Sequence, residues 1–244
     1  MAFWRRIVAA LAIGVASFAL DASAAHVTPM VLELDETGTQ SSSRIQVGNT
    51  GDRQLPVELR VFSAEINEYG QPDFTPADED FLVFPPQAVI EAGSQQAFRV
   101  QYLGSEPLDT SKIYYVSVRQ VPVDLDPTIS QVQIVTTFNV LVNVVPEGTE
   151  ANISIDWAKP AEKNGLPGVE VRLVNDGDRY FSAGSTGWRL TGKSSDGEAL
   201  TKVYRGNSAG EQIGYGVVPP GKARIFFVPT DAPFAEVTNI EIDR

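Results

Sequence analysis

The 244-residue sequence contains no cysteine and a single histidine, His26. Without thiols the chain has no disulfide framework, and without a second imidazole it lacks the usual ligand sets for zinc, copper and iron. The same shortage excludes a Ser–His or Cys–His nucleophile pair. We therefore expect no catalytic residues, no metal and no other cofactor, and we expect that the protein is not an enzyme.

Carboxylates are plentiful, but their spacing matches no known site. The densest cluster is Asp78-Glu79-Asp80, whose oxygens could hold calcium. It lacks the alternating spacing and the glycine of a calcium loop, and the pair Asp124 and Asp126 lacks them too. We interpret both segments as solvated loops, so a hydrolase that uses paired carboxylates is the weakest functional alternative.

Basic residues are few and scattered. Lys and Arg number 19 against 31 Asp and Glu, which gives a net charge of −12. Binding to nucleic acid or to anionic lipid needs clustered cations that contact phosphates. We therefore expect no nucleic-acid partner.

Long apolar runs are absent except at the amino terminus. Arg5 and Arg6 precede the apolar residues 7–20, and the small residues Ala22-Ser23-Ala24 follow. This order predicts a secretory signal peptide over residues 1–25 that is removed on export, with a retained anchor as the alternative. No later stretch approaches the roughly 18 apolar residues of a membrane span, so we expect no integral membrane segment after cleavage.

An internal repeat divides the remainder of the chain. The stretch QVGNTGDR at 46–53 recurs as LVNDGDR at 173–179, and VIEAGSQQAFRV at 89–100 aligns without gaps on VVPPGKARIFFV at 217–228. Each half therefore has a strand that ends in an Asn-x-Gly turn and, later, a glycine-containing turn that leads into an apolar strand. A period this long indicates two copies of one domain rather than a solenoid.

Apolar segments separated by Gly, Pro, Asn and Asp predict strands throughout both halves, and no segment reads as a good helix. The expected strands are 43–49, 55–66, 81–85, 95–103, 112–123, 153–159, 168–175, 187–192, 199–205, 223–229 and 237–243. Short strands at regular spacing are typical of an immunoglobulin-like sandwich. The predicted fold class is all-β, with two tandem immunoglobulin-like β-sandwich domains at 26–146 and 151–244, joined by a hinge at 147–150.

The longest predicted strand lies in SQVQIVTTFNVLVNVVPEG, residues 130–148. Its alternation continues for about 15 residues, or about 50 Å, whereas most strands have three to ten residues. Val140 to Val144 are expected to complete the core of their own domain. The surplus length before them raises the question of what it packs against.

The two-sandwich layout, the SVRQVP that ends one strand and the VVPEG that closes the long strand resemble the PapD-like periplasmic pilus-assembly chaperones of the chaperone–usher family. The landmarks RVF, PP…I.AG and RV within residues 59–102 resemble the archaic or alternate branch most closely. The resemblance covers nearly the whole chain after the signal peptide. It implies a chaperone in the periplasm that binds pilin or fimbrial subunits and delivers them to an outer-membrane usher.

The resemblance also implies which residues bind the subunit. In this family the last strand of the first domain fills the unfinished sandwich of a pilin through main-chain bonds and alternating side chains. The family register, counted back from Pro146, implies the donors Val132, Ile134, Thr136 and Phe138, with Thr136 as the weakest filler. The alternative is that these residues only complete the protein's own core.

The resemblance is incomplete where a pilin's terminal carboxylate binds. The better-known branch uses an Arg and a Lys at positions that fall here near Met30 and Leu141, so both cations are missing. A carboxylate still favours a charged donor, and a bidentate Arg suits it best. Arg99, and after it Arg119, are the predicted anchors, unless each faces solvent on the polar side of its strand.

A structural protein is the alternative function, either a secreted fimbrial subunit or a carbohydrate-binding adhesive sandwich. Its stacking surface would use exposed aromatics such as Tyr69, Trp157, Trp188 and Tyr215. Core packing explains most aromatics in sandwiches, so the sequence favours the chaperone.

Overall fold

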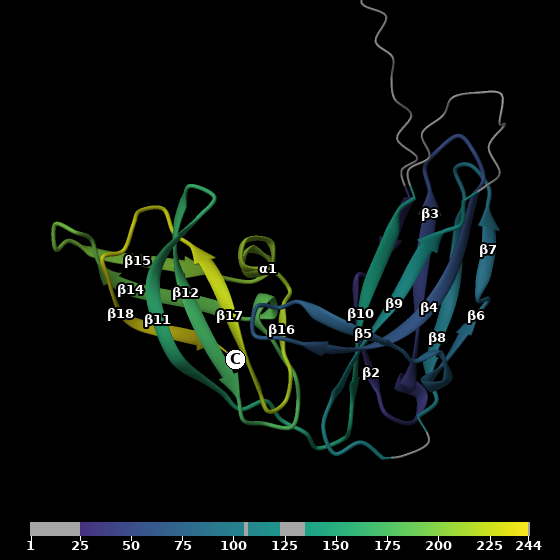
Figure 1. Ribbon diagram of the computed structural model, residues 1–244, viewed down its shortest axis with the longest axis horizontal. Helices are drawn as coiled ribbons and strands as arrows, with labels where there is room; N and C mark the ends of the chain where they lie inside the picture. Colours follow the sequence, from purple (N-terminus) through teal and green to yellow (C-terminus); the bar gives the residue numbers. More distant parts are fainter. Residues whose placement is uncertain (1–24, 105–106, 123–134, 244) are drawn as a thin grey trace, which may run out of the picture.

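The computed structural model describes residues 25–104, 107–122 and 135–243. Figure 1 shows two β modules joined by a short connection. Each module has its own core of buried apolar side chains, the first drawn from Val27 to Val144 and the second from Val169 to Phe234. The predicted fold class is therefore confirmed. The predicted signal peptide lies outside the described residues except for Ala25, which opens the first strand.

The first module is a sandwich of two sheets. Sheet A has the strand order β1-β3-β8-β6, and sheet B has the order β2-β10-β9-β4-β5, with β7 paired to β4. The strands are β1 (Ala25–Thr28), β2 (Val31–Asp35), β3 (Ser42–Asn49), β4 (Leu55–Ile66), β5 (Pro72–Pro76), β6 (Phe81–Phe84), β7 (Gln87–Ile90), β8 (Gln95–Tyr102), β9 (Lys112–Gln120) and β10 (Thr137–Val145). Two 3₁₀ turns, η1 (Thr39–Ser41) and η2 (Asp78–Asp80), connect them.

Alternation along these strands decides which side chains form the core. On β3, Ile45 and Val47 are completely buried and Gln46 between them is exposed. On β8, Phe98 and Val100 are completely buried and Arg99 between them is exposed. Burial of such side chains contributes about 25 cal/mol per Å² of apolar surface. The period of two that predicted the strands therefore also predicted the inner face of each sheet.

The second module contains three small sheets and one short helix. The sheets are β11-β12-β17, β13-β16 and β15-β14-β18. Their elements are β11 (Ile153–Lys163), β12 (Leu166–Asn175), β13 (Phe181–Ser182), η3 (Ala183–Ser185), β14 (Gly187–Lys193), β15 (Ala199–Tyr204), α1 (Asn207–Ile213), β16 (Val217–Val218), β17 (Lys222–Pro229) and β18 (Glu236–Asp243). The sequence analysis missed α1, because a seven-residue helix that buries Ala209 is too short to show a helical period.

The sequence repeat corresponds to one hydrogen-bonding arrangement built twice. Asn49 donates from Nδ2 to the carbonyls of Arg53 (2.7 Å) and Ile90 (3.0 Å), and its Oδ1 accepts from the amide of Gly51 (3.0 Å). In the second module the same three bonds are made by Asn175, which donates to the carbonyls of Arg179 (2.8 Å) and Val218 (3.1 Å) and accepts from the amide of Gly177 (3.1 Å). Both asparagines are buried, and each satisfies one buried backbone carbonyl, that of Ile90 or that of Val218.

A hairpin of the first module reaches the second module. Residues between β4 and β5 place the carbonyl of Glu68 within 2.7 Å of the amide of Ile225, and the Glu68 carboxylate contacts Arg172 at 3.4 Å. Nearby, the guanidinium of Arg224 donates to the carbonyl of Val217 (2.8 Å), and burial lowers its pKa. The two modules are therefore held together by main-chain and charged contacts as well as by the connecting segment.

A second contact joins the modules on the other side of the connection. Arg179 pairs with Glu33 of β2 at 2.7 Å, and the hydroxyl of Tyr180 donates to the same carboxylate at 2.5 Å. Burial, followed by the bond to Glu33, raises the pKa of Tyr180, so the phenol is a neutral donor at physiological pH. The predicted hinge at 147–150 lies between β10, which ends at Val145, and β11, which begins at Ile153.

Candidate subunit-binding site

The first half of β10 is an open strand edge. β10 pairs antiparallel with β9 from Thr137 to Val144, but its parallel pairing with β2 covers only Leu141–Val145. The amide of Leu141 donates to the carbonyl of Met30 (3.0 Å), so it points away from β9. Backbone groups alternate along a strand, so those of Thr137 and Asn139 point to the same side, where no described residue pairs with them.

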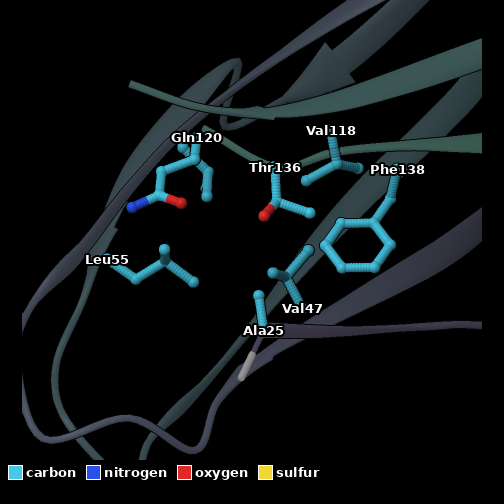
Figure 2. A pocket seen from close by; sticks show the side chains of 8 residues that line it. Ala25, Val47, Leu55, Val118, Gln120, Thr136 and Phe138 are labelled. Carbon is cyan, nitrogen blue, oxygen red and sulfur yellow. The ribbon is translucent and has the colours of Figure 1, made fainter. Parts of the chain in front are cut away.

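A small pocket lies at the same end of the module, between the two sheets (Figure 2). Thr136 and Phe138 line it from the β10 side, facing Ala25 and Val47 of sheet A, and the remaining walls come from Leu55, Val57, Val118 and Gln120. The cavity volume is about 10 Å³, the size of about one water molecule. Thr136 and Phe138 therefore form one wall of a small cavity at this end of the sandwich.

Two of the four predicted donors lie within the described residues, and the structure brings them together. Thr136 and Phe138 are half-buried on the inner side of β10, and Phe138 packs against the core. The carbonyl of Thr136 accepts from the amide of Gln120 (3.0 Å), which extends the β9 ladder by one residue beyond β10. Val132 and Ile134 lie outside the described residues, so the described strand has nine residues rather than about 15.

The second half of β10 belongs to the protein's own core, as the sequence predicted. Val140, Val142 and Val144 are completely buried. Asn143 is also completely buried. The inward side chains of β10 therefore change from half-buried to fully buried between Phe138 and Val140, just before the pairing with β2 begins at Leu141.

The two predicted carboxylate anchors lie on different sheets. Arg119 is exposed on the outer face of sheet B, where its Cα is paired with those of Thr137 and Glu58. Arg99 is exposed on the outer face of sheet A and donates to Gln101 (3.0 Å). The structure therefore places Arg119 beside the open edge of β10 and Arg99 on the opposite sheet.

The positions near Met30 and Leu141 are neighbours in space, joined by the backbone bond between them. Met30 is 44 % exposed, whereas Leu141 is buried in a small cluster with Ile113 and Val217 of the second module. The surface between the modules is therefore apolar at the two positions where the better-known branch has cations.

Other residues singled out from the sequence have structural roles. Asp78 accepts three bonds from the Arg60 guanidinium and one from the amide of Val61 (2.9 Å), and the pKa of Asp78 is lowered mainly by the guanidinium. Asp80 accepts from the hydroxyl of Tyr114 (2.7 Å). Trp188 is buried and donates to the carbonyl of Ala183 (2.9 Å), so it does not belong to an exposed stacking surface.

Among the described residues, no group of three or more His, Asp or Glu side chains is arranged to hold a metal ion. Nor does any helix in the described part of the chain have the length and apolar character needed to cross a membrane.

The tandem sandwiches and the open edge of β10 define an all-β protein equipped for strand pairing. A family model, the pili and flagellar-assembly chaperone PapD N-terminal domain, matches residues 26–150, which is half of the chain. The chain belongs to this family of PapD-like assembly chaperones.

Solved structures with the same fold are also chaperones, although distant in sequence. CfaA, a class 5 fimbriae chaperone, is 13% identical with a TM-score of 0.53, over 91% of this chain and 99% of CfaA. A chain from the Salmonella enterica complex of the SafA pilin with the SafB chaperone is 15% identical with a TM-score of 0.52, over 90% and 95%. A chain from the Acinetobacter baumannii CsuC–CsuE complex is 14% identical with a TM-score of 0.50, over 83% and 89%. A comparison with curated proteins finds no match.

The sequence analysis did not anticipate the backbone of Asn139 as part of the site. Strand alternation indicates which side chains face inward, but it does not indicate which strand edge stays unpaired. That information depends on β2, which runs parallel to β10 and whose first residue, Val31, pairs with Leu141, beyond Asn139. One signal for this edge was available in the sequence. Pro29 interrupts the first strand, and there the chain crosses from β1 in sheet A to β2 in sheet B.

Proposed function

We propose that this chaperone acts in the periplasm, binds pilin or fimbrial subunits by donor-strand complementation and delivers them to an outer-membrane usher. One observation carries the proposal: no described residue pairs with the outward backbone groups of Thr137 and Asn139, beside the small cavity that Thr136 and Phe138 line. A subunit that lacks a strand has the complementary need, because each unsatisfied buried polar group costs about 1 to 3 kcal/mol. The family match favours this function over the adhesive alternative.

Capture of a subunit would extend sheet B across the open edge. The subunit strand would pair with the odd-numbered residues of β10, and the donor side chains Val132, Ile134, Thr136 and Phe138 would fill the subunit's groove. The same strand would shield the exposed edge, which is otherwise a template for aggregation. The proposed donor segment thus ends at Phe138, just before the core residues of β10 begin at Val140.

The edge pairing is tested by Asn139→Pro. Proline removes the amide of Asn139, one of those that point to the open side, and leaves the bonds to β9 in place, which an edge strand tolerates. The expected result is at least about a tenfold lower yield of complex when the variant is co-expressed with the pilin of its own assembly system. Asn139→Ala, which keeps the amide, is the matched control and should retain the yield. A folded Asn139→Pro variant with an undiminished yield would overturn the proposal.

The carboxylate anchor is tested in the same assay. Because Arg119 lies beside Thr137, we propose that Arg119, rather than Arg99, binds the terminal carboxylate of the subunit. Arg119→Ala should lower the yield of complex about tenfold, the effect of one charge-assisted hydrogen bond. Arg99→Ala is its matched control on the opposite sheet, and an unchanged yield with Arg119→Ala would exclude that residue as the anchor.

A further inference from the structure

The outer face of sheet A carries no negative charge, although the chain has a net charge of −12. The four strands of this sheet contain no Asp or Glu, and their charged residues are Arg44 and Arg99. Both side chains are exposed. This face therefore has the opposite charge to most of the molecule.

The two arginines lie directly opposite each other on neighbouring strands. Arg44 and Arg99 are Cα partners in the pairing of β3 with β8, and Arg99 is also the partner of Phe84 on β6. In the described residues neither guanidinium has an ion pair, whereas Arg60 pairs with Asp78 and Arg189 with Glu241. Like charges directly opposite each other destabilise a sheet, so this arrangement is not explained by folding.

Exposed apolar side chains continue the same row. Phe84 is 67 % exposed and Leu82 is 45 % exposed, both on the outer side of β6. Leu82 is the Cα partner of Gln101, whose side chain accepts the bond from Arg99. Two cations, an amide and two large apolar groups therefore form one continuous strip across three strands.

This chemistry matches an acidic protein segment. A carboxylate placed between two guanidiniums accepts charge-assisted hydrogen bonds from both and removes their mutual repulsion. An aromatic or aliphatic side chain next to that carboxylate would cover Phe84 and Leu82, and such buried aromatic and Arg groups dominate the affinity of protein interfaces.

We propose that the strip formed by Arg44, Arg99, Phe84 and Leu82 binds an acidic segment of a partner protein, with an Asp or Glu between the arginines and an apolar neighbour on Phe84. The strip lies on the sheet opposite β10, so it is separate from the subunit-binding edge. The surface therefore recruits a second partner while β10 holds its client.

The proposal is tested with a random peptide library displayed on phage and panned against the full-length mature protein. Peptides that combine Asp or Glu with an adjacent aromatic or aliphatic residue should be enriched. Their affinity should fall about tenfold for Arg44→Gln or Arg99→Gln. The affinity of the parent protein for these peptides should also fall in high salt. The matched control Arg189→Gln, on another sheet, should leave the affinity unchanged. Enriched peptides without acidic residues, or binding insensitive to both arginine variants, would overturn the proposal.

A second variant separates recognition from folding. Arg99→Glu would create a cross-strand ion pair with Arg44, so its melting temperature should equal or exceed that of the parent protein, while peptide binding is lost. Retained binding by a stable Arg99→Glu protein would overturn the proposal. Because this test needs no pilin, its failure is distinguishable from failure of the subunit-capture assay.

Discussion

Asn49 in the first module and Asn175 in the second make the same three hydrogen bonds to equivalent backbone groups. The modules differ at β10, which lies outside the aligned stretches of the two halves. The second half of β10 pairs with both β9 and β2, whereas its first half pairs only with β9 among the described strands. The repeated elements therefore build each sandwich, and the unrepeated strand carries the open edge that we propose binds the subunit.

The largest loss of stability should come from replacing the two asparagines. Asn49→Ala and Asn175→Ala each leave one buried carbonyl without a donor, that of Ile90 or Val218, so each should lower the free energy of unfolding of its own module by about 1 to 3 kcal/mol. Apart from Trp4 in the predicted signal peptide, the tryptophans Trp157 and Trp188 both lie in the second module. Their fluorescence during urea unfolding therefore reports that module, while circular dichroism reports both.

The expected pattern is a shift of the fluorescence transition for Asn175→Ala and a shift seen only by circular dichroism for Asn49→Ala. Unequal costs that differ by more than about 2 kcal/mol would show that the two turns are not energetically equivalent, whatever their geometry. Asp52→Ala, which removes an exposed ion pair with Arg53 in the same loop, serves as the control for a mutation at this turn.

A smaller effect should separate the modules at acid pH. The pKa of Asp78 is lowered by its bond to the Arg60 guanidinium, so its contribution to stability is present above about pH 4 and is lost as the pH falls through the lower, folded-state value. The pair is partly exposed, which limits the contribution to about 0.5 to 1 kcal/mol.

Asp78→Asn should therefore destabilise the first module at about pH 7 and become indistinguishable from the parent at about pH 2. The measurement is the urea midpoint by circular dichroism at both pH values, with tryptophan fluorescence as the internal control for the second module. A deficit that persists at the lower pH would mean that packing of the side chain, not its charge, supports the turn at η2.

Much of this arrangement could be predicted from the sequence. Period-two alternation predicted β4 at its observed bounds, and the Asn-x-Gly repeat indicated two copies of one fold. The sequence could not assign Arg99 and Arg119 to their sheets, because alternation shows that each faces outward but not which sheet its strand joins. That assignment depends on pairings between distant residues, such as Arg99 with Arg44 and Arg119 with Thr137.

The open edge was predictable only in part. The excess apolar length suggested that the strand binds something outside its own module. The boundary between the open and the paired parts of β10, however, is set by its pairing with β2, which begins at Leu141. Likewise, Arg44 was overlooked, although the absence of Asp and Glu from 42–49 and 95–102 was visible in the sequence. Charge that is missing from a strand is harder to notice than charge that is present.

The tip of the β4–β5 hairpin approaches the second module closely at a residue without a side chain. Gly70 has a φ of 81°, and a Cβ atom there would lie 2.3 Å from Nη2 of Arg224, whose guanidinium also stacks on Phe226. Any side chain at this position would therefore require the guanidinium to shift, and the positive φ disfavours every residue except glycine. Close contact between the two halves at this point thus depends on the absence of a single carbon atom.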